Sequence, residues 1–542
     1  DFAFGASSRS SKMLHGGIRY LEQRDLSLVR EALQERDLLL KNAPHLTRMR
    51  DFLFPVIPKR SRSAWQINLG LSLYSLLAKN FHAQASVGPH KKSLFRHASS
   101  PSSIESRKLE SMGLCFSKLF TYFDGQMDDA RIVIENIVDA GVLGALTINY
   151  ACIEELRLAK TVNDKYWQVK WKCNISNESF ESKAKFVVNA AGSWAPELHN
   201  IAYPQDKEEW GKKLPTVIFS RGSHLLFSQP WPTSGVILPT PTKGRYYFVW
   251  PYYAPGAQAT MVGTTEIPLT NNEENSLSSQ QEVEELLGYL RRDLPNSHLN
   301  ESTLYRTFSG VRTLVIPSRS HKRANFFAKN TGTSNISRTH VWIERDSYLC
   351  LLGGKFTNAR ATAEEASQKI HMLFGKNRDR TYGEESTRHR PLPGAKDWSE
   401  HEKNKLIEKL VSVFTQRANC FSDRQKSAAL PSIQLEANNA VMRFGIRAKA
   451  LLDEKYNIAK FDPVISDFAS PLLQAQIRYA IIQEQAVKIE DILRRRLSIT
   501  LLPAGQVRGL EEAKRELLSL SYRNHKEIDK DISDYQNSWI GK

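Results

Sequence analysis

The chain has 542 residues, of which 41% are hydrophobic and 25% are charged. A chain of this length and composition can bury a large core and is expected to form about three to four domains. Wholesale disorder, collagen and coiled-coil fibres are therefore excluded. The most apolar stretch, residues 68–78, is too short and too rich in hydroxyl groups to span a bilayer, so we expect no integral membrane protein.

The formal net charge is +17, from 75 Lys and Arg against 58 Asp and Glu. Such an excess favours anionic partners, namely nucleic acid, anionic lipid or a phosphorylated small molecule. The basic residues are scattered in short clusters such as 59–62 and 494–496, without a recognisable nucleic-acid module, and an ordinary basic surface is the simplest interpretation. Five cysteines without a CxxC spacing predict a reducing compartment.

The first half of the chain predicts an α/β layer. Residues 25–41 place Leu26, Val29, Leu33 and Leu40 on one face, which predicts an amphipathic helix, and residues 128–140 follow the same pattern. Strands are predicted at 146–153, 166–175 and 186–190, and the last of them runs into a glycine turn. The order of helix, strand, hairpin, strand and glycine turn is typical of nucleotide-binding folds.

Strands dominate the segment from about 214 to 352. Prolines and glycines separate them, which predicts an antiparallel sheet. The predicted strands are 216–219, 224–227, 245–250, 260–263 and 348–352. Two stretches, 91–107 and 331–337, are predicted to be surface insertions.

The last part of the chain is predicted to be helical. Residues 378–396 are charged and contain Pro391 and Pro393, which predicts a linker. A helix is predicted to begin at Ser470 and Pro471, since proline is favoured in the first turn, and to continue through 494–496.

Four glycine-marked motifs are candidates for chemistry. Residues 5–22 combine hydroxyl groups, a lysine and a Gly-Gly pair, which permit close backbone approach to an anion. Residues 187–194 form a predicted buried strand that ends in small residues, and residues 351–360 form a strand, Gly-Gly and a helix start. The fourth is a set of polar segments in the strand-rich part, at 221–224, 263–266 and 309–313. Taken singly, each of these segments also fits an ordinary structural role.

In this order and spacing, the motifs resemble the FAD-dependent glycerol-3-phosphate dehydrogenase family. The most specific strings are SSRSSKMLHGGIRYLE, which begins at Ser7, and TYFDGQMDDAR, which begins at Thr121. The resemblance runs from residue 1 to about 375 and continues more faintly through 477–480 and 491–496.

The resemblance implies three units. They are an α/β FAD-binding domain of the glutathione-reductase-like Rossmann type, an antiparallel-sheet substrate domain and an all-helical C-terminal domain. The expected boundaries are 1–50, 120–213 and 345–377 for the FAD-binding domain, 51–119 and 214–344 for the substrate domain, 378–396 for a linker and 397–542 for the helical domain.

The resemblance also implies a reaction, in which sn-glycerol 3-phosphate is oxidised to dihydroxyacetone phosphate by hydride transfer from C2 to flavin N5. It places five residues around the substrate: Arg19, Tyr20, His224, Arg312 and Lys355. Arginine and lysine suit a dianionic phosphate. His224 is the expected base because imidazole titrates near working pH, and Lys355 is the competitor.

A second set of residues is expected to contact FAD. It consists of Ser7, Ser8, Ser10, Ser11, Lys12, Leu14, His15, Gly17, Ile153, Gly192, Trp194, Gly354, Lys355 and Thr357. No Gly-x-Gly occurs in the sequence, so the family's pyrophosphate-binding turn is absent. We therefore expect an N-terminally truncated chain that by itself binds FAD poorly.

The sequence departs from the family pattern in several places. The family usually has Thr-Gly-Pro at 191–193, an aspartate where this chain has Glu266 and a proline where it has Thr313. Phe356, Asn358 and Ala359 also differ from the family pattern. Details of the pocket are therefore expected to have changed, whereas the cationic residues remain.

The electron acceptor is expected, by resemblance, to be a membrane quinone. The expected location is peripheral, at an anionic membrane surface of a bacterial inner membrane or of the mitochondrial inner membrane. An oxidase that uses oxygen, a relative that acts on an amino acid, and a non-catalytic basic protein that binds nucleic acid are the alternatives. Whether the chain forms a homodimer stays open.

Overall fold

The computed structural model describes residues 1–18, 21, 25–82, 104–161, 165–242, 244–252, 259–272, 278–317, 339–373, 387–418, 423–456, 470–500, 509–520 and 523–537. Arg19, Tyr20, the predicted insertion at 331–337 and most of the one at 91–107 lie outside the described residues. So does 378–386 of the predicted linker.

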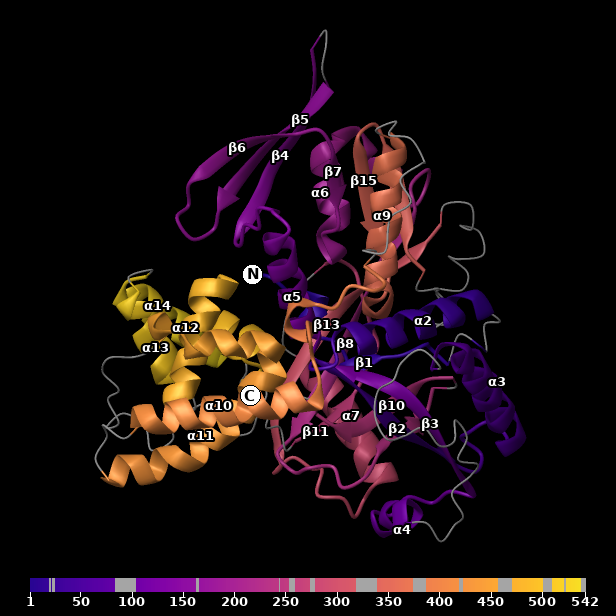
Figure 1. Ribbon diagram of the computed structural model, residues 1–542. Coiled ribbons are helices and arrows are strands. Elements are labelled where there is room, and N and C mark those ends of the chain that lie inside the picture. Colours follow the sequence, from indigo (N-terminus) through magenta and orange to yellow (C-terminus); the bar gives the residue numbers. More distant parts are fainter. Residues whose placement is uncertain are drawn as a thin grey trace.

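The largest unit is a nine-stranded sheet with the order β1-β3-β2-β9-β10-β11-β8-β12, in which β13 also pairs with β8 (Figure 1). All of its pairs are antiparallel except the short parallel contact between β2 and β9. The strands are β1 (Met13–Leu14), β2 (Thr47–Val56), β3 (Lys118–Met127), β8 (Thr216–Phe227), β9 (Gly235–Pro239), β10 (Tyr246–Pro251), β11 (Thr260–Gly263), β12 (Ile267–Leu269) and β13 (Leu304–Ile316).

The large sheet differs from the sequence-based expectations in the extent of one strand and in the position of two domain boundaries. The strands predicted at 216–219 and 224–227 form one strand, because the intervening residues also pair with β13. The domain boundaries expected at 50/51 and 119/120 fall inside β2 and β3, which pair residue for residue from Thr47 to Val56. Both strands therefore belong wholly to the large sheet.

Helices cover both faces of this sheet. On one face, α2 (Leu26–Asn42) and α3 (Ala64–His82) pack together against the aromatic side chains of β2 and β3. The side chain of Asp25 caps α2 by accepting a hydrogen bond from the Leu28 amide at 3.1 Å. On the other face, α7 (Gln280–Asp293) buries four aliphatic residues against β8 and β10. The short helix α4 (Ile104–Ser111) lies at the edge of this layer.

A second unit contains two three-stranded sheets. In the first, β7 (Val187–Asn189) pairs in parallel with β15 (Tyr348–Leu352), and β14 (Val341–Arg345) pairs with β15. In the second, β4 (Ala151–Lys160), β5 (Lys165–Cys173) and β6 (Ser179–Ala184) form an antiparallel meander. The helices of this unit are α5 (Asp129–Val142), α6 (Ala195–Ala202) and α9 (Ala359–Leu373).

The strand predicted at 146–153 begins later than expected. Pairing with β5 starts at Ala151, and the preceding Leu146 is 86% exposed. Residues 143–150 instead form the turn that follows α5.

The C-terminal unit is helical, as predicted. Its α-helices are α10 (Glu400–Ala418), α11 (Asp423–Phe444), α12 (Pro471–Glu484), α13 (Leu510–Ser519) and α14 (His525–Asn537). The helix predicted from Ser470 through 496 is two helices, because Gln485 adopts a left-handed conformation with φ of 53° that ends α12. A short π-helix, Asp491–Arg496, follows.

The basic cluster at 494–496 is not on the surface. All three guanidinium groups are buried, and acidic groups balance them at Glu490, Asp491 and Asp1. Buried charges are stable only when they are paired in this way. Nearby, Arg131 of α5 binds the buried Glu484 of α12 at 2.7 Å, which joins the helical unit to the second unit.

Candidate functional site

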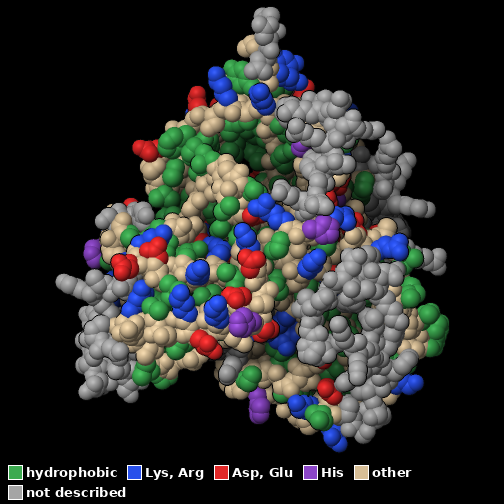
Figure 2. Space-filling view, in the orientation of Figure 1, with side chains coloured by type: hydrophobic (Ala, Val, Ile, Leu, Met, Phe, Trp, Pro, Cys, Tyr) green, Lys and Arg blue, Asp and Glu red, His purple; other side chains and the backbone are tan. Residues whose placement is uncertain are grey.

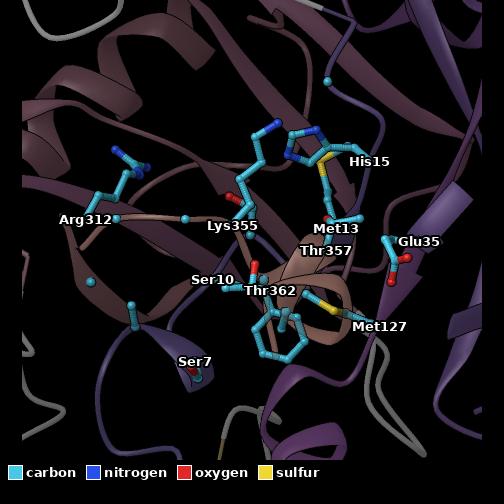
Figure 3. Close-up of a pocket in the computed structure, with 18 of the residues that line it drawn as sticks. Ser7, Ser10, Met13, His15, Glu35, Met127, Arg312, Lys355, Thr357 and Thr362 are labelled. Carbon is cyan, nitrogen blue, oxygen red and sulfur yellow. The ribbon is translucent and has the colours of Figure 1, made fainter. Parts of the chain in front are cut away.

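A cavity of about 2180 Å³ lies between the large sheet and the second unit. Ordinary ligand pockets measure roughly 300–1,000 Å³, so this cavity has room for a large cofactor together with a small substrate. Hydrophobic side chains surround a hollow beneath the β4–β5–β6 sheet, near β7 (Figure 2). Polar and cationic side chains enter the cavity from several elements (Figure 3).

The N-terminal loop forms one wall of the cavity. The lining residues from this loop include Ser7, Ser10, Ser11, His15 and Gly17. Ser10 donates a hydrogen bond to Asp129 at 2.6 Å, which fixes the loop to the first turn of α5. Five of the predicted cofactor residues in this segment therefore lie at the cavity.

Three predicted cofactor residues of this segment lie beneath the cavity surface instead. Lys12 forms a buried ion pair with Asp129, Leu14 packs in a core with Leu46 and Met127, and Ser8 is 2% exposed. Burial raises the pKa of Asp129, and the Lys12 ammonium opposes that shift. Lys12 therefore holds the loop in place and is not among the residues that line the cavity.

The ends of two parallel strands form a second wall. Gly192 and Trp194 follow β7, and Gly354, Lys355 and Thr357 follow β15. Ligands of open α/β sheets bind at the carboxyl ends of parallel strands. Gly354 has φ of 100°, and a Cβ atom on Gly192 would meet nothing within 4 Å, so the backbone here is open to a bound group.

Ile153 is not part of the cavity lining. It lies in β4 and packs against the core that contains Leu156 and Trp167. Its predicted contact with adenine stays untested.

Arg312 enters the cavity from β13 (Figure 3). Its guanidinium donates hydrogen bonds to Thr264 Oγ1 at 2.7 Å and to the Thr265 carbonyl at 3.3 Å. A Cβ atom on Gly222 would lie 2.1 Å from Arg312 Nη2, so this conformation of Arg312 requires glycine at position 222.

His224 lies on the neighbouring strand, β8, and also lines the cavity. Its Nε2 atom lies 2.9 Å from Ser11 Oγ, and its ring stacks on Phe308 with 4.9 Å between the ring centroids. Burial, followed by the charges of Arg312 and Lys12, lowers the pKa of His224 to about 3. The ring therefore stays neutral at working pH and does not titrate there as expected from the sequence.

Lys355 is the remaining described member of the predicted substrate set, and it lines the cavity with His224 and Arg312. It follows the Gly353–Gly354 pair and precedes the short 3₁₀ turn that leads into α9. Figure 3 shows Lys355, His15 and Arg312 directed into the same cavity.

A buried carboxylate that sequence reasoning missed lies behind the site. Glu282, in the first turn of α7, accepts hydrogen bonds from Thr265 Oγ1 at 2.7 Å and Ser223 Oγ at 2.8 Å. It also pairs with Arg221 at 2.8 Å. Burial alone would raise the pKa of Glu282, but the hydrogen bonds from Thr265, Ser223 and Ser279 hold it below its ordinary value.

A second buried network, also missed, supports the Gly-Gly turn. The Gly16 amide donates to Tyr74 Oη at 2.8 Å, and Tyr74 donates to Asp124 at 2.9 Å. Asp124 also pairs with Arg36 at 3.0 Å. Burial raises the pKa of Asp124 to about 6 in spite of these partners. Asp124 belongs to the TYFDG string, so the motif was visible although its role was not.

Residues 1–367 match the family model described as FAD dependent oxidoreductase. Residues 385–520 match the model described as the C-terminal domain of alpha-glycerophosphate oxidase. The cavity agrees with a flavin cofactor, because its volume, its glycine-lined strand ends and its serine-rich wall suit a large nucleotide.

Curated relatives are similar over nearly the whole chain. A glycerol-3-phosphate dehydrogenase of Synechocystis sp. is 28% identical over 93% of this chain and 83% of its own length. A D-erythritol 1-phosphate dehydrogenase of Brucella abortus is 27% identical over 92% and 87%, respectively. A probable mitochondrial glycerol-3-phosphate dehydrogenase of Dictyostelium discoideum is 27% identical over 93% and 73%.

The fold has a counterpart among solved structures. The glycerol-3-phosphate dehydrogenase of Bacillus halodurans, solved with FAD, superposes with a TM-score of 0.65 and 18% identity. The match covers 99% of this chain and 88% of that one, so it includes both the cavity-forming units and the helical unit. The chain belongs to the FAD-dependent oxidoreductase family and carries, behind the flavin domain, the C-terminal domain of the alpha-glycerophosphate oxidases.

Proposed function

We propose that this protein oxidises sn-glycerol 3-phosphate to dihydroxyacetone phosphate, with FAD as the hydride acceptor and a quinone as the final electron acceptor. The observation that carries the proposal is the joint presence of Arg312, Lys355 and His224 in one large cavity beside the strand ends of a flavin domain. The names of the similar proteins from Synechocystis, Brucella and Dictyostelium point to the same class of substrate, a phosphorylated polyol.

The phosphate is assigned to Arg312. Two neutral oxygen acceptors, the Thr264 hydroxyl and the Thr265 carbonyl, hold its guanidinium at the cavity. Lys355 supplies a second positive charge in the same cavity. Each charge-assisted hydrogen bond to the phosphate contributes about 1.5–3 kcal/mol.

The C2 hydroxyl proton is assigned to a base that is either His224 or Lys355. His224 is neutral and so can accept a proton, but its low pKa makes it a weak base in the ligand-free cavity. A dianionic substrate beside the ring would raise that pKa, because a nearby negative charge favours the protonated form. Ser11, at 2.9 Å from Nε2, orients the ring.

The flavin is assigned to the N-terminal loop and the two strand ends. Ser7, Ser10, Ser11, His15 and Gly17 would line it on one side, and Gly192, Trp194, Gly354, Lys355 and Thr357 on the other. The Ser10–Asp129 and Gly16–Tyr74 hydrogen bonds keep the loop in one conformation, which lowers the entropic cost of binding.

A quinone acceptor would reach the flavin from a membrane surface, and we propose α3 as the element that contacts this surface. Its inner face is buried, whereas Trp65, Leu69 and Leu76 on its outer face are 59–67% exposed. Hydrophobic side chains gather over this helix at the right edge of Figure 2. Trp65 and Leu69 also line the cavity, so the cavity extends to this exposed face of α3.

Basic residues precede this helix. Lys59 and Arg62 are exposed next to Trp65, which suits an anionic lipid surface at about 1 kcal/mol per basic residue close to it. Among the described residues, no helix is long and apolar enough to cross a membrane. We therefore propose peripheral attachment through α3.

A substrate comparison tests the function. Purified protein loaded with FAD is mixed with a redox dye and with glycerol 3-phosphate, D-erythritol 1-phosphate or glycerol. We expect dye reduction with the phosphorylated compounds and little with glycerol. Faster turnover of oxygen to peroxide than of a soluble quinone would favour the oxidase instead. Retention of DNA on a filter, without any dye reduction, would favour the non-catalytic alternative.

A further inference from the structure

Glu282 makes more contacts than its place in the helix requires. It is the third residue of α7 and forms a capping box with Ser279. In this box, Oε2 of Glu282 accepts hydrogen bonds from the Ser279 amide at 3.0 Å and from the Ser279 hydroxyl at 2.9 Å. Its Oε1 atom accepts two further hydrogen bonds, from Ser223 and Thr265, that do nothing for the helix. The carboxylate is fully buried, so these bonds replace water that it would otherwise bind.

The two extra bonds connect α7 to the cavity from behind the sheet. Ser223 lies between Gly222 and His224 in β8, and alternate side chains of a strand point to opposite faces. Glu282 therefore lies on the face opposite to His224, and it is not among the residues that line the cavity. It cannot touch a ligand there directly.

Thr265 carries the connection through to Arg312. Its hydroxyl donates to Glu282 at 2.7 Å and accepts from the Ser223 amide at 2.8 Å, while its carbonyl accepts from Arg312. The neighbouring Thr264 hydroxyl accepts the second bond from Arg312. Thr264 and Thr265, which both accept hydrogen bonds from the guanidinium, thus lie on a loop that Glu282 holds against β8.

We infer that Glu282 is a positioning residue for phosphate recognition, which acts through Thr265 on Arg312. The inference rests on the proposed function. An arginine that is held in one place loses less side-chain entropy when it binds an anion, so loosening the loop weakens binding without removing a charge from the cavity.

The test is a double-mutant cycle on the FAD-loaded protein. Glu282→Gln, Arg312→Ala and the double variant are compared with the wild type for KM and kcat with glycerol 3-phosphate, and for the Kd of inorganic phosphate by calorimetry. Thr265→Val, which removes the connecting hydroxyl, is the second variant in case Glu282→Gln does not fold. Glu284→Gln, an exposed residue two positions along α7, is the matched control.

We expect Glu282→Gln to raise KM and the phosphate Kd about tenfold, with kcat changed less than about twofold. In the Arg312→Ala background, the same substitution is expected to change neither value. An equal increase in both backgrounds would mean that Glu282 only stabilises the fold, and it would overturn the inference. So would an unchanged KM in Thr265→Val.

The phosphate titration separates this inference from the proposed function. If the wild type binds phosphate but does not oxidise glycerol 3-phosphate, the proposed function fails, and the cycle on Kd still decides the role of Glu282. If the wild type binds neither compound, the cavity has no phosphate site and both conclusions fall.

Discussion

Arg312→Ala provides the most direct test of phosphate recognition. The substitution removes one cation from the cavity. The Thr264 hydroxyl and the Thr265 carbonyl stay partnered without Arg312, because this hydroxyl also donates to this carbonyl at 3.1 Å. The measured effect should therefore reflect the missing contact to the ligand and not a newly unsatisfied polar group at Thr264 or Thr265.

A single charge-assisted contact of about 1.5–3 kcal/mol corresponds to a loss of about 10- to 150-fold in kcat/KM for glycerol 3-phosphate. Glycerol has no phosphate, so its kcat/KM should change less than about threefold. Dye reduction with both compounds, at matched FAD content, measures the two effects together. Arg291→Ala, an exposed arginine of α7, is the control for loss of positive charge.

An equal loss with glycerol and with glycerol 3-phosphate, at unchanged FAD content, would refute the assignment. Arg312 would then act on hydride transfer or on the shape of the pocket. A loss only in the Arg291→Ala control would instead indicate that long-range electrostatic attraction of the substrate accounts for the affinity.

Three other predictions concern the same site and its surroundings. Gly222→Ala should displace the guanidinium of Arg312 and raise KM for glycerol 3-phosphate, with a melting temperature within a few degrees of wild type; an unchanged KM would show that this conformation of Arg312 is not needed. Folded His224 has a pKa of about 3, below the ~6.5 of a free imidazole, so the stability that the neutral ring contributes is present above about pH 6.5 and is lost as the pH falls toward 3. In thermal melts, His224→Asn should reduce this loss of stability at low pH. A ring that titrates between pH 5 and 8 by NMR would contradict the low pKa. The double variant Trp65→Ser/Leu69→Ser should sediment less with anionic vesicles than the wild type. Wild-type binding should also weaken as salt is added, because the Debye length falls from about 10 Å at 0.1 M to about 3 Å at 1 M. Vesicle binding that neither salt nor the substitutions reduce would exclude α3 as the membrane contact.

The local patterns predicted elements well, and long-range pairing decided the rest. The helix at 25–41 was visible from its apolar spacing, since this pattern acts within a few residues. Glu282 was not visible, because its partners Ser223 and Thr265 are brought to it by a sheet register that no local pattern specifies.

The arginine triplet at 494–496 illustrates the same limit from the opposite direction. A run of three basic residues ordinarily predicts a solvated face, since charged side chains are almost never fully buried unless they are paired. Here the acidic partners come from the same turn, at Glu490 and Asp491, and from Asp1 at the far end of the sequence. The nearer carboxylates were a signal in the sequence, but their orientation follows from the π-helical turn.

The pairing of β8 with β13 explains how residues distant in sequence reach one cavity. Gly222 lies opposite Gly310, and His224 lies opposite Phe308, so these side-chain positions share one face of the sheet. Arg312, two residues beyond Gly310, lies on the same face.

The two facing glycines leave a gap on that face of the sheet, and each accommodates a different neighbour. The space at Gly222 accommodates the guanidinium of Arg312, and the backbone of Arg9 passes over Gly310, where a Cβ atom would lie 3.0 Å from its carbonyl oxygen. The serine-rich loop that contains Arg9 therefore lies directly against the strand that carries Arg312. A side chain at either glycine would separate the wall assigned to the flavin from the arginine assigned to the phosphate, so the glycine pair couples the two halves of the proposed site.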